Sequence, residues 1–196
     1  DGKIFIAAEP GRSMLFREAA QKMPGEVIAC LADRKRQFET VRQDLAATQF
    51  AEVEVDVETG VIRVLKMVGV SNCGTAINPL TAENQLIGAQ IQGASWALFE
   101  QRTLDRSVGT MVNPNLEAYK ILGPADMFEA VPILTTGANA GNNTSATGIA
   151  EPVFVPTLAA IANAVFNATG VRLRQLPMTP DRVLAALAGA KKEGRP

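Results

Sequence analysis

Histidine is absent from this chain of 196 residues, which has only two cysteines, one tryptophan and one tyrosine. Without histidine, the chain alone cannot build Ser-His-Asp or Cys-His catalytic systems, nor most zinc catalytic sites. Cys30 and Cys73 stand far apart and form no C-x-x-C motif, which argues against a zinc site, an iron–sulfur cluster or a disulfide scaffold. One disulfide between them remains an alternative, but a reducing compartment is the simpler interpretation.

The chain also lacks an excess of charge of either sign. Its 19 basic and 20 acidic residues give a net charge of -1, so nothing in the composition favours nucleic acid or an acidic membrane surface as a partner. Polar residues or prolines interrupt the longest apolar stretches, at Glu151, Pro152, Pro156 and Asn163, so we expect no direct membrane insertion. The chain begins at Asp1 without a signal-peptide pattern, as a processed subunit or a fragment would.

What the chain does contain is a clear strand pattern. Residues 50–56 alternate apolar and acidic side chains, residues 57–60 have the composition of a turn, and residues 61–70 are mostly apolar, which together predict a β-hairpin. Before it, residues 3–8 fit a short strand, and Ser13 fits the cap of a helix over 14–20. The charged stretch from Arg34 to Arg42 predicts an exposed segment.

Two long helices are expected after the hairpin. Asn78-Pro79 predicts the start of a helix over 80–99, and two glycines inside it, Gly88 and Gly93, suggest the close approach of a backbone or a ligand. Residues 101–136 suggest strands and turns. A helix over 157–168, a strand over 171–174 and a helix starting at Pro180 follow. Strands and helices segregate along the chain, so the predicted fold class is α+β, a mixed sheet packed against long helices.

Several polar residues lie in positions that suit either structure or function. Glu151 lies between a small-residue loop and an apolar run. On residue type alone, the interpretation as an exposed carboxylate at a helix N-terminus is favoured over the interpretation as a general base. The loop 72–79 could hold an anion, although an ordinary strand–helix connection is favoured. The amides of Gln85, Gln90 and Gln92 could contact a cofactor, although contacts with backbone or water are favoured.

Seven motifs in one order then carry a resemblance. They are F-A-E-V-E-V-D-x-E-T-G, N-C-G-x-x-I-N-P, N-Q-L-x-G-A-x-x-Q-G, N-P-N-x-x-x-Y-K, G-I-A-E-P, A-I-A-N-A-V-F-N-A-T-G-V-R and L-P-M-T-P-D-R-V-L-A-A-L. Each alone is a weak signal, but their common order is specific. The chain resembles the C-terminal part of the molybdopterin-binding subunit of the xanthine dehydrogenase and aldehyde oxidase family. The predicted organisation is a lead-in segment over 1–47, this subdomain over 48–188 and a flexible tail over 189–196.

The resemblance assigns roles to three residues. Glu151 matches the active-site glutamate of the family and would be the general base that takes a proton from a water-derived oxygen nucleophile. A partly dry pocket would then bring its pKa near the value that a base needs. Gln85 matches a glutamine beside the molybdenum and its pterin, and Gly148 belongs to the cofactor-binding loop. The residue before Glu151 is Ala150, where the family usually has glycine. No metal ligand is assigned to this chain.

The resemblance also implies a larger enzyme. The cofactor would be molybdopterin with molybdenum, as a mononucleotide or a cytosine dinucleotide, and a 2Fe-2S cluster and FAD or haem would be carried by partner chains. Expected partners are the rest of the molybdenum subunit, an iron–sulfur subunit, a flavin or cytochrome subunit and a small substrate, either an aldehyde or an N-heteroaromatic ring. The alternative is a structural half without a catalytic group. The expected compartment is the cytoplasm, or the periplasm for an exported complex.

Overall fold

The structure, a computed structural model, describes residues 2–25, 29, 46–135 and 144–192. The chain divides into two compact units, residues 1–40 and residues 41–196. The boundaries expected from the sequence, at 47/48 and 188/189, stay predictions. Helix α4 (Pro180–Lys192) continues past residue 188, and the charged stretch from Arg34 to Arg42 lies outside the described residues.

The first unit is a small hairpin followed by one short helix. Strands β1 (Lys3–Ile6) and β2 (Glu9–Leu15) pair antiparallel, and α1 (Phe16–Gln21) follows directly. The strand expected near residue 3 is confirmed, but the helix cap expected at Ser13 is wrong. Ser13 pairs with Phe5 in the hairpin, and the helix starts three residues later. Pairing with a neighbouring strand outweighs the local helical pattern here.

The second unit is built on a mixed three-stranded sheet in the order β3-β4-β7. Strands β3 (Ala46–Val55) and β4 (Ile62–Asn72) form the predicted antiparallel hairpin. Strand β7 (Glu129–Thr135) lies parallel to β4, and the connection between these two strands contains helix α2 (Pro79–Leu98). A parallel pair requires such a crossover, so one strand–helix–strand unit stands inside the α+β fold.

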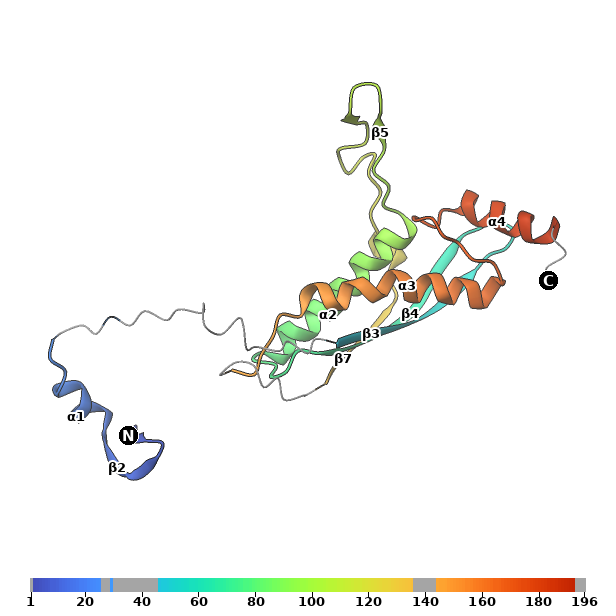
Figure 1. Cartoon of the computed structure of the whole chain (residues 1–196). Helices are drawn as coiled ribbons and strands as arrows, with labels where there is room; N and C mark the ends of the chain where they lie inside the picture. Colours follow the sequence, from blue (N-terminus) through green and yellow to red (C-terminus); the bar gives the residue numbers. More distant parts are fainter. Residues whose placement is uncertain (1, 26–28, 30–45, 136–143, 193–196) are drawn as a thin grey trace. The chain divides into compact units, whose positions relative to one another are not determined.

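Helices α2 and α3 (Ala150–Thr169) lie on the same face of this sheet, α3 over β3 and α2 towards β7 (Figure 1). Between the helices and the sheet lies the main core, whose fully buried side chains include Met67, Ala94, Ile161, Val165 and Val183. By length and composition alone, residues 151–169 could cross a membrane, but an internal helix of a globular fold meets the same criterion. The mixed sheet covered by helices confirms the predicted fold class.

The start predicted for α2 is confirmed, whereas the start predicted for α3 lies too late in the sequence. Helix α2 begins at Pro79, with the Asn78 side chain accepting a hydrogen bond of 3.3 Å from the Thr81 N–H. Helix α3 begins at Ala150 rather than at residue 157, so it includes Pro152 and Pro156. Proline is tolerated in a first helical turn but is unfavourable further inside, which is why the sequence suggests a later start.

The strand expected over residues 171–174 does not form. Gly170 ends α3 in the left-handed conformation, with φ of 72°, and the chain then turns back over the helix. The Arg172 guanidinium donates a hydrogen bond of 2.6 Å to Asn163 and stacks 3.9 Å from the ring centre of Phe166. Val171 is buried in the fold. These contacts with α3 replace strand pairing for this segment.

Three short elements complete the second unit. Strands β5 (Leu104–Asp105) and β6 (Thr110–Met111) form a small antiparallel hairpin after α2, and a 3₁₀ turn, η1 (Pro124–Asp126), precedes β7. This agrees with the strands and turns expected over 101–136. Helix α4 begins at Pro180, as predicted.

Candidate active site

Two loops that are far apart in the sequence are joined by backbone hydrogen bonds. The Thr75 N–H donates to the Ser145 carbonyl at 2.8 Å, and the Thr147 N–H donates to the Cys73 carbonyl at 3.0 Å. The first loop turns sharply at Gly74, whose φ is 67° and whose N–H donates to the Asn72 side chain at 2.8 Å. The N-C-G motif therefore lies against the loop that leads to Glu151, an adjacency that the sequence alone does not reveal.

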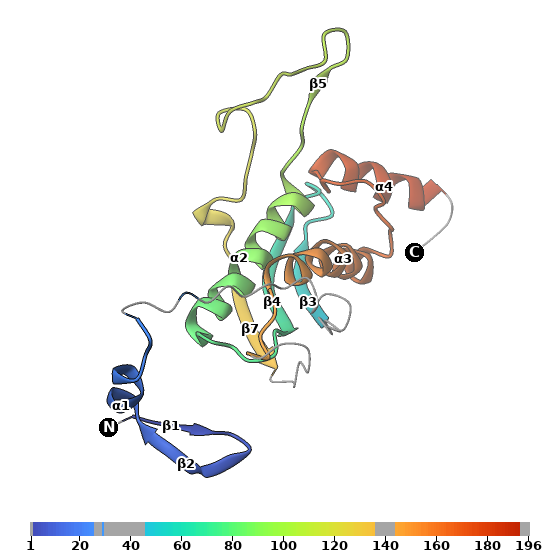
Figure 2. The same cartoon turned by 60° about the vertical axis from the view of Figure 1, so that its left-hand side comes forward.

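The same two loops lead into α2 and α3. Helices α2 and α3 lie side by side (Figure 2). Near their starts, Leu86, Ala89 and Val153 form a small buried cluster that is separate from the main core. Gln85 is the neighbour of Leu86 in α2, and Glu151 lies two residues before Val153 in α3. The structure thus brings the elements that carry the two predicted site residues together at one end of the helix pair.

All three predicted site residues are exposed. Glu151 lies in the first turn of α3, Gln85 in the second turn of α2 and Gly148 in the loop before α3. A Cβ atom added at Gly148 would meet no atom of the described residues within 4 Å, so they leave the space beside this loop open. The partly dry pocket expected around Glu151 is not formed by the described residues alone. An exposed carboxylate in a first helical turn also suits the helix dipole, so its catalytic role stays a prediction.

The three glutamines of α2 separate into different environments. Gln85 and Gln92 are exposed, whereas Gln90 is fully buried and its amide has no hydrogen-bond partner among the described residues. The two glycines of α2 also differ. A Cβ at Gly93 would overlap the Thr157 side chain of α3, whereas a Cβ at Gly88 would meet nothing within 4 Å. Close approach of another helix therefore explains Gly93, whereas the described residues leave open space beside Gly88.

The loop before α3 contains a residue in an uncommon backbone conformation. Ser145 has φ of 53°, in the left-handed region that residues other than glycine seldom adopt. It lies where the two loops meet, since its carbonyl accepts the hydrogen bond from Thr75. Such conformations occur more often at functional sites than elsewhere.

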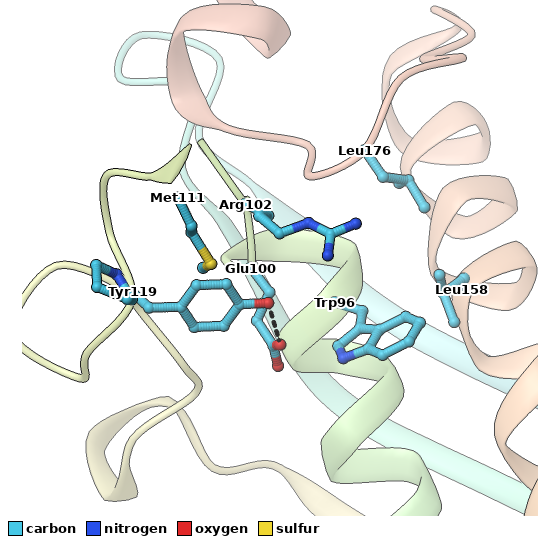
Figure 3. Close-up of a pocket in the computed structure, with 8 residues that line it drawn as sticks. Trp96, Glu100, Arg102, Met111, Tyr119, Leu158 and Leu176 are labelled. Atoms are coloured by element: carbon cyan, nitrogen blue, oxygen red, sulfur yellow. Dashed lines mark hydrogen bonds between the residues drawn. The ribbon is translucent and has the colours of Figure 1, made fainter. Parts of the chain in front are cut away.

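A pocket of about 660 Å³ lies near the other end of α2 (Figure 3). Trp96 and Glu100 contribute from α2 and the residues after it, and Leu158 contributes from α3. The Tyr119 hydroxyl donates a hydrogen bond of 2.8 Å to Glu100, and this bond raises the pKa of Tyr119 above its ordinary value. Trp96 also packs edge-on against Phe154, with 4.9 Å between the ring centres. The sequence alone does not predict this pocket, because its lining comes from segments that only the fold brings together.

Within the part of the chain that the structure describes, no three histidine, cysteine or acidic side chains gather as metal ligands would. Cys73 is buried and has no disulfide partner among the described residues, and Cys30 lies outside them. The exposed amide of Gln85, the exposed carboxylate of Glu151 and the open glycine loop fit a large polar cofactor that brings its own metal. They would give it hydrogen bonds and a proton acceptor.

Comparisons with known proteins identify the family of the chain. Residues 12–128 match the family model described as a molybdopterin cofactor-binding domain. The chain is 37% identical over 147 residues to the aldehyde oxidoreductase molybdenum-binding subunit PaoC of Escherichia coli (strain K12), covering 74% of this chain and 20% of that protein. It is 34% identical over 134 residues to the putative xanthine dehydrogenase molybdenum-binding subunit XdhA of the same strain, covering 68% and 18%.

A solved structure shares the fold. Quinoline 2-oxidoreductase from Pseudomonas putida 86 superposes with a TM-score of 0.64 at 26% sequence identity, over 74% of this chain and 18% of that chain. The chain thus spans about a fifth of the length of the relatives it matches.

Proposed function

This chain belongs to the molybdopterin cofactor-binding domain family, together with the molybdenum-binding subunits of aldehyde oxidoreductases and xanthine dehydrogenases, and we propose that it is one part of the catalytic subunit of such an enzyme. The enzyme oxidises an aldehyde or an N-heteroaromatic substrate with oxygen derived from water. The observation that carries the proposal is the pairing of loops 72–78 and 144–149, which brings the helices of Gln85 and Glu151 together in a member of this family.

The proposed roles follow from what each group can donate or accept. When bound, the molybdopterin cofactor with its molybdenum would supply the redox chemistry. The Gln85 carboxamide hydrogen-bonds the cofactor and orients it. The Glu151 carboxylate accepts the proton that the water-derived oxygen loses as it forms a bond to the substrate carbon. Gly148 leaves room for the cofactor beside the loop.

The remaining parts of the enzyme come from other chain segments. Ile77 and Leu80, at the start of α2, are 78% and 69% exposed, which is unusual for large apolar side chains beside a site. We propose that the rest of the molybdenum subunit covers them and supplies the dry surroundings that a general base needs.

An iron–sulfur subunit with a 2Fe-2S cluster and a subunit with FAD or haem then carry the electrons away. The cofactor is the mononucleotide or the cytosine dinucleotide form, and the enzyme works in the cytoplasm or as an exported complex in the periplasm.

The competing proposal is that the chain completes the fold of the molybdenum subunit without a catalytic group. A Glu151→Gln variant of the molybdenum-loaded assembly separates the two, because glutamine keeps the size of the side chain but cannot take the proton. We expect turnover to fall by about 10²- to 10⁴-fold at unchanged molybdenum content. Glu58→Gln, which alters an exposed carboxylate in the β3–β4 turn, serves as the matched control and should leave turnover unchanged. Normal turnover of Glu151→Gln would support the structural role instead.

A further inference from the structure

The start of α3 contains two residues that cannot donate a backbone hydrogen bond. Pro152 lies in the first turn, where helical N–H groups have no partner inside the helix. Pro156 lies one turn later, and its missing N–H leaves the Pro152 carbonyl without the partner that a regular helix would give it. This end of the helix, which carries Glu151, is therefore poorly held by its own backbone.

A side chain from the sheet spans this weak turn. The Gln49 carboxamide, on β3, donates through Nε2 to the Val153 carbonyl and accepts at Oε1 a hydrogen bond of 2.9 Å from the Thr157 hydroxyl. The two partners are on either side of Pro156. Gln49 is 7% exposed, and Val153 and Thr157 are fully buried, so water does not compete for these bonds.

Two glycines allow this arrangement. Thr157 fits against α2 only because Gly93 has no side chain, so the hydroxyl is held facing Gln49. Gly69 is the direct pairing partner of Gln49 on β4, and a Cβ there would meet the Gln90 carboxamide. Gln49 and Gln90 therefore share one buried space beneath α3, yet of the two only Gln49 has hydrogen-bond partners among the described residues.

We propose that Gln49 is a positioning residue for Glu151: its buried carboxamide holds the proline-containing first turns of α3 in place and so fixes the carboxylate two residues before Val153. The inference rests on the proposed function of Glu151. The position of Glu151 matters, because a general base must lie within hydrogen-bond reach of the proton it takes. Loss of the Gln49 bonds would let this helix end move, and a displacement of about 1 Å can slow a reaction about 100-fold.

The test uses Gln49→Met in the molybdenum-loaded assembly, a substitution that keeps the length of the side chain and removes both hydrogen bonds. We expect kcat to fall about 10- to 100-fold with KM and molybdenum content near the wild-type values. Amide hydrogen exchange over residues 150–157 should become faster in the same preparation. Thr157→Val should show the same change to a smaller extent, and Thr157→Ser, which keeps the hydroxyl, should restore turnover.

Gln90→Met is the matched control. It makes the same substitution in the same buried space, but it removes an amide that has no partner in the described part of the chain. Turnover and exchange over 150–157 should therefore both stay at the wild-type level. Equal losses in Gln49→Met and Gln90→Met would mean general damage to the core and would overturn the proposal.

A double variant distinguishes positioning from stability. If Gln49 acts through Glu151, then Gln49→Met should slow a Glu151→Gln enzyme no further, whereas two independent effects would multiply. Wild-type turnover of Gln49→Met in an assembly that Glu151→Gln inactivates would contradict the inference. Should Glu151→Gln itself be active, the proposed function fails, and hydrogen exchange alone then decides the role of Gln49: faster exchange supports it, and unchanged exchange overturns it.

Discussion

Single residues in this chain set how closely its two long helices can approach each other. Gly93 of α2 faces Thr157 of α3 at a point where no side-chain carbon fits, whereas Gly88, five residues earlier in α2, faces open space. Both glycines suggest a close approach when only the sequence is considered. Only the helix crossing shows that Gly93 is required by packing within the chain and that Gly88 is not.

The two glycines predict opposite effects of the same substitution. Gly93→Ala should lower the free energy of unfolding by about 1–3 kcal/mol, because the added methyl overlaps Thr157 and forces the helices apart. Gly88→Ala should raise it by about 0.5–1 kcal/mol, because alanine restricts the unfolded chain and meets no atom in the folded one. Urea unfolding of the two variants measures both. Equal destabilisation by the two substitutions would show that the helix crossing is wrong.

At the scale of elements, the sequence predicts what depends on nearby residues. The β3–β4 hairpin, the start of α2 at Asn78-Pro79 and the start of α4 at Pro180 depend on alternation, caps and prolines, and the structure has them where the patterns place them. Two other expectations failed because distant contacts decide the outcome. Helix α3 extends back through Pro156, where Gln49 from β3 bonds the proline-containing turns, and residues 171–174 pack on α3 instead of forming a strand.

The turn of the β3–β4 hairpin predicts how the stability of the fold depends on pH. Asp56 accepts hydrogen bonds from Thr59 and from the Glu58 N–H, and these bonds lower its pKa below the ordinary value of 3.8. Because the folded-state pKa lies below the unfolded one, ionised Asp56 stabilises the fold. That contribution is complete above pH 3.8 and is lost as the pH falls through the lower folded-state value.

Thermal unfolding across this acid range should therefore show a smaller loss of stability in Asp56→Asn than in the wild type, because asparagine has no carboxylate to protonate. At neutral pH, where asparagine still accepts the two backbone hydrogen bonds, the variant should be only slightly less stable. An identical acid dependence in the two proteins would contradict the role of this turn.

For the whole molecule, the main feature is that the proposed site residues lie at the surface of the described chain, where we propose that other parts of the enzyme cover them. The predicted site residues are exposed, and large apolar side chains beside them are exposed as well. The chain spans about a fifth of its relatives, so both observations fit a piece of a larger subunit. The sequence suggested the site residues through a family resemblance, but it could not predict their exposure, because exposure depends on which other segments are present.

If another part of the subunit covers the exposed start of α2, a polar substitution there should weaken assembly. Ile77→Ser should lower the fraction of chain that associates with the rest of the molybdenum subunit, because it removes apolar surface that becomes buried there. The stability of the chain by itself should hardly change, since Ile77 is 78% exposed. Co-purification of the two parts measures the effect, with Ile77→Leu as the apolar control. Normal assembly of Ile77→Ser would mean that another surface makes the contact.

The most direct test of the central claim is the rate of a single turnover in Glu151→Gln, measured on assemblies with equal molybdenum content. A single turnover reports the chemical step without product release or electron transfer to later acceptors. If Glu151 is the general base, substrate should reduce the molybdenum centre about 10²- to 10⁴-fold more slowly than in the wild type. An unchanged rate would contradict the account and leave this chain a structural part of its enzyme.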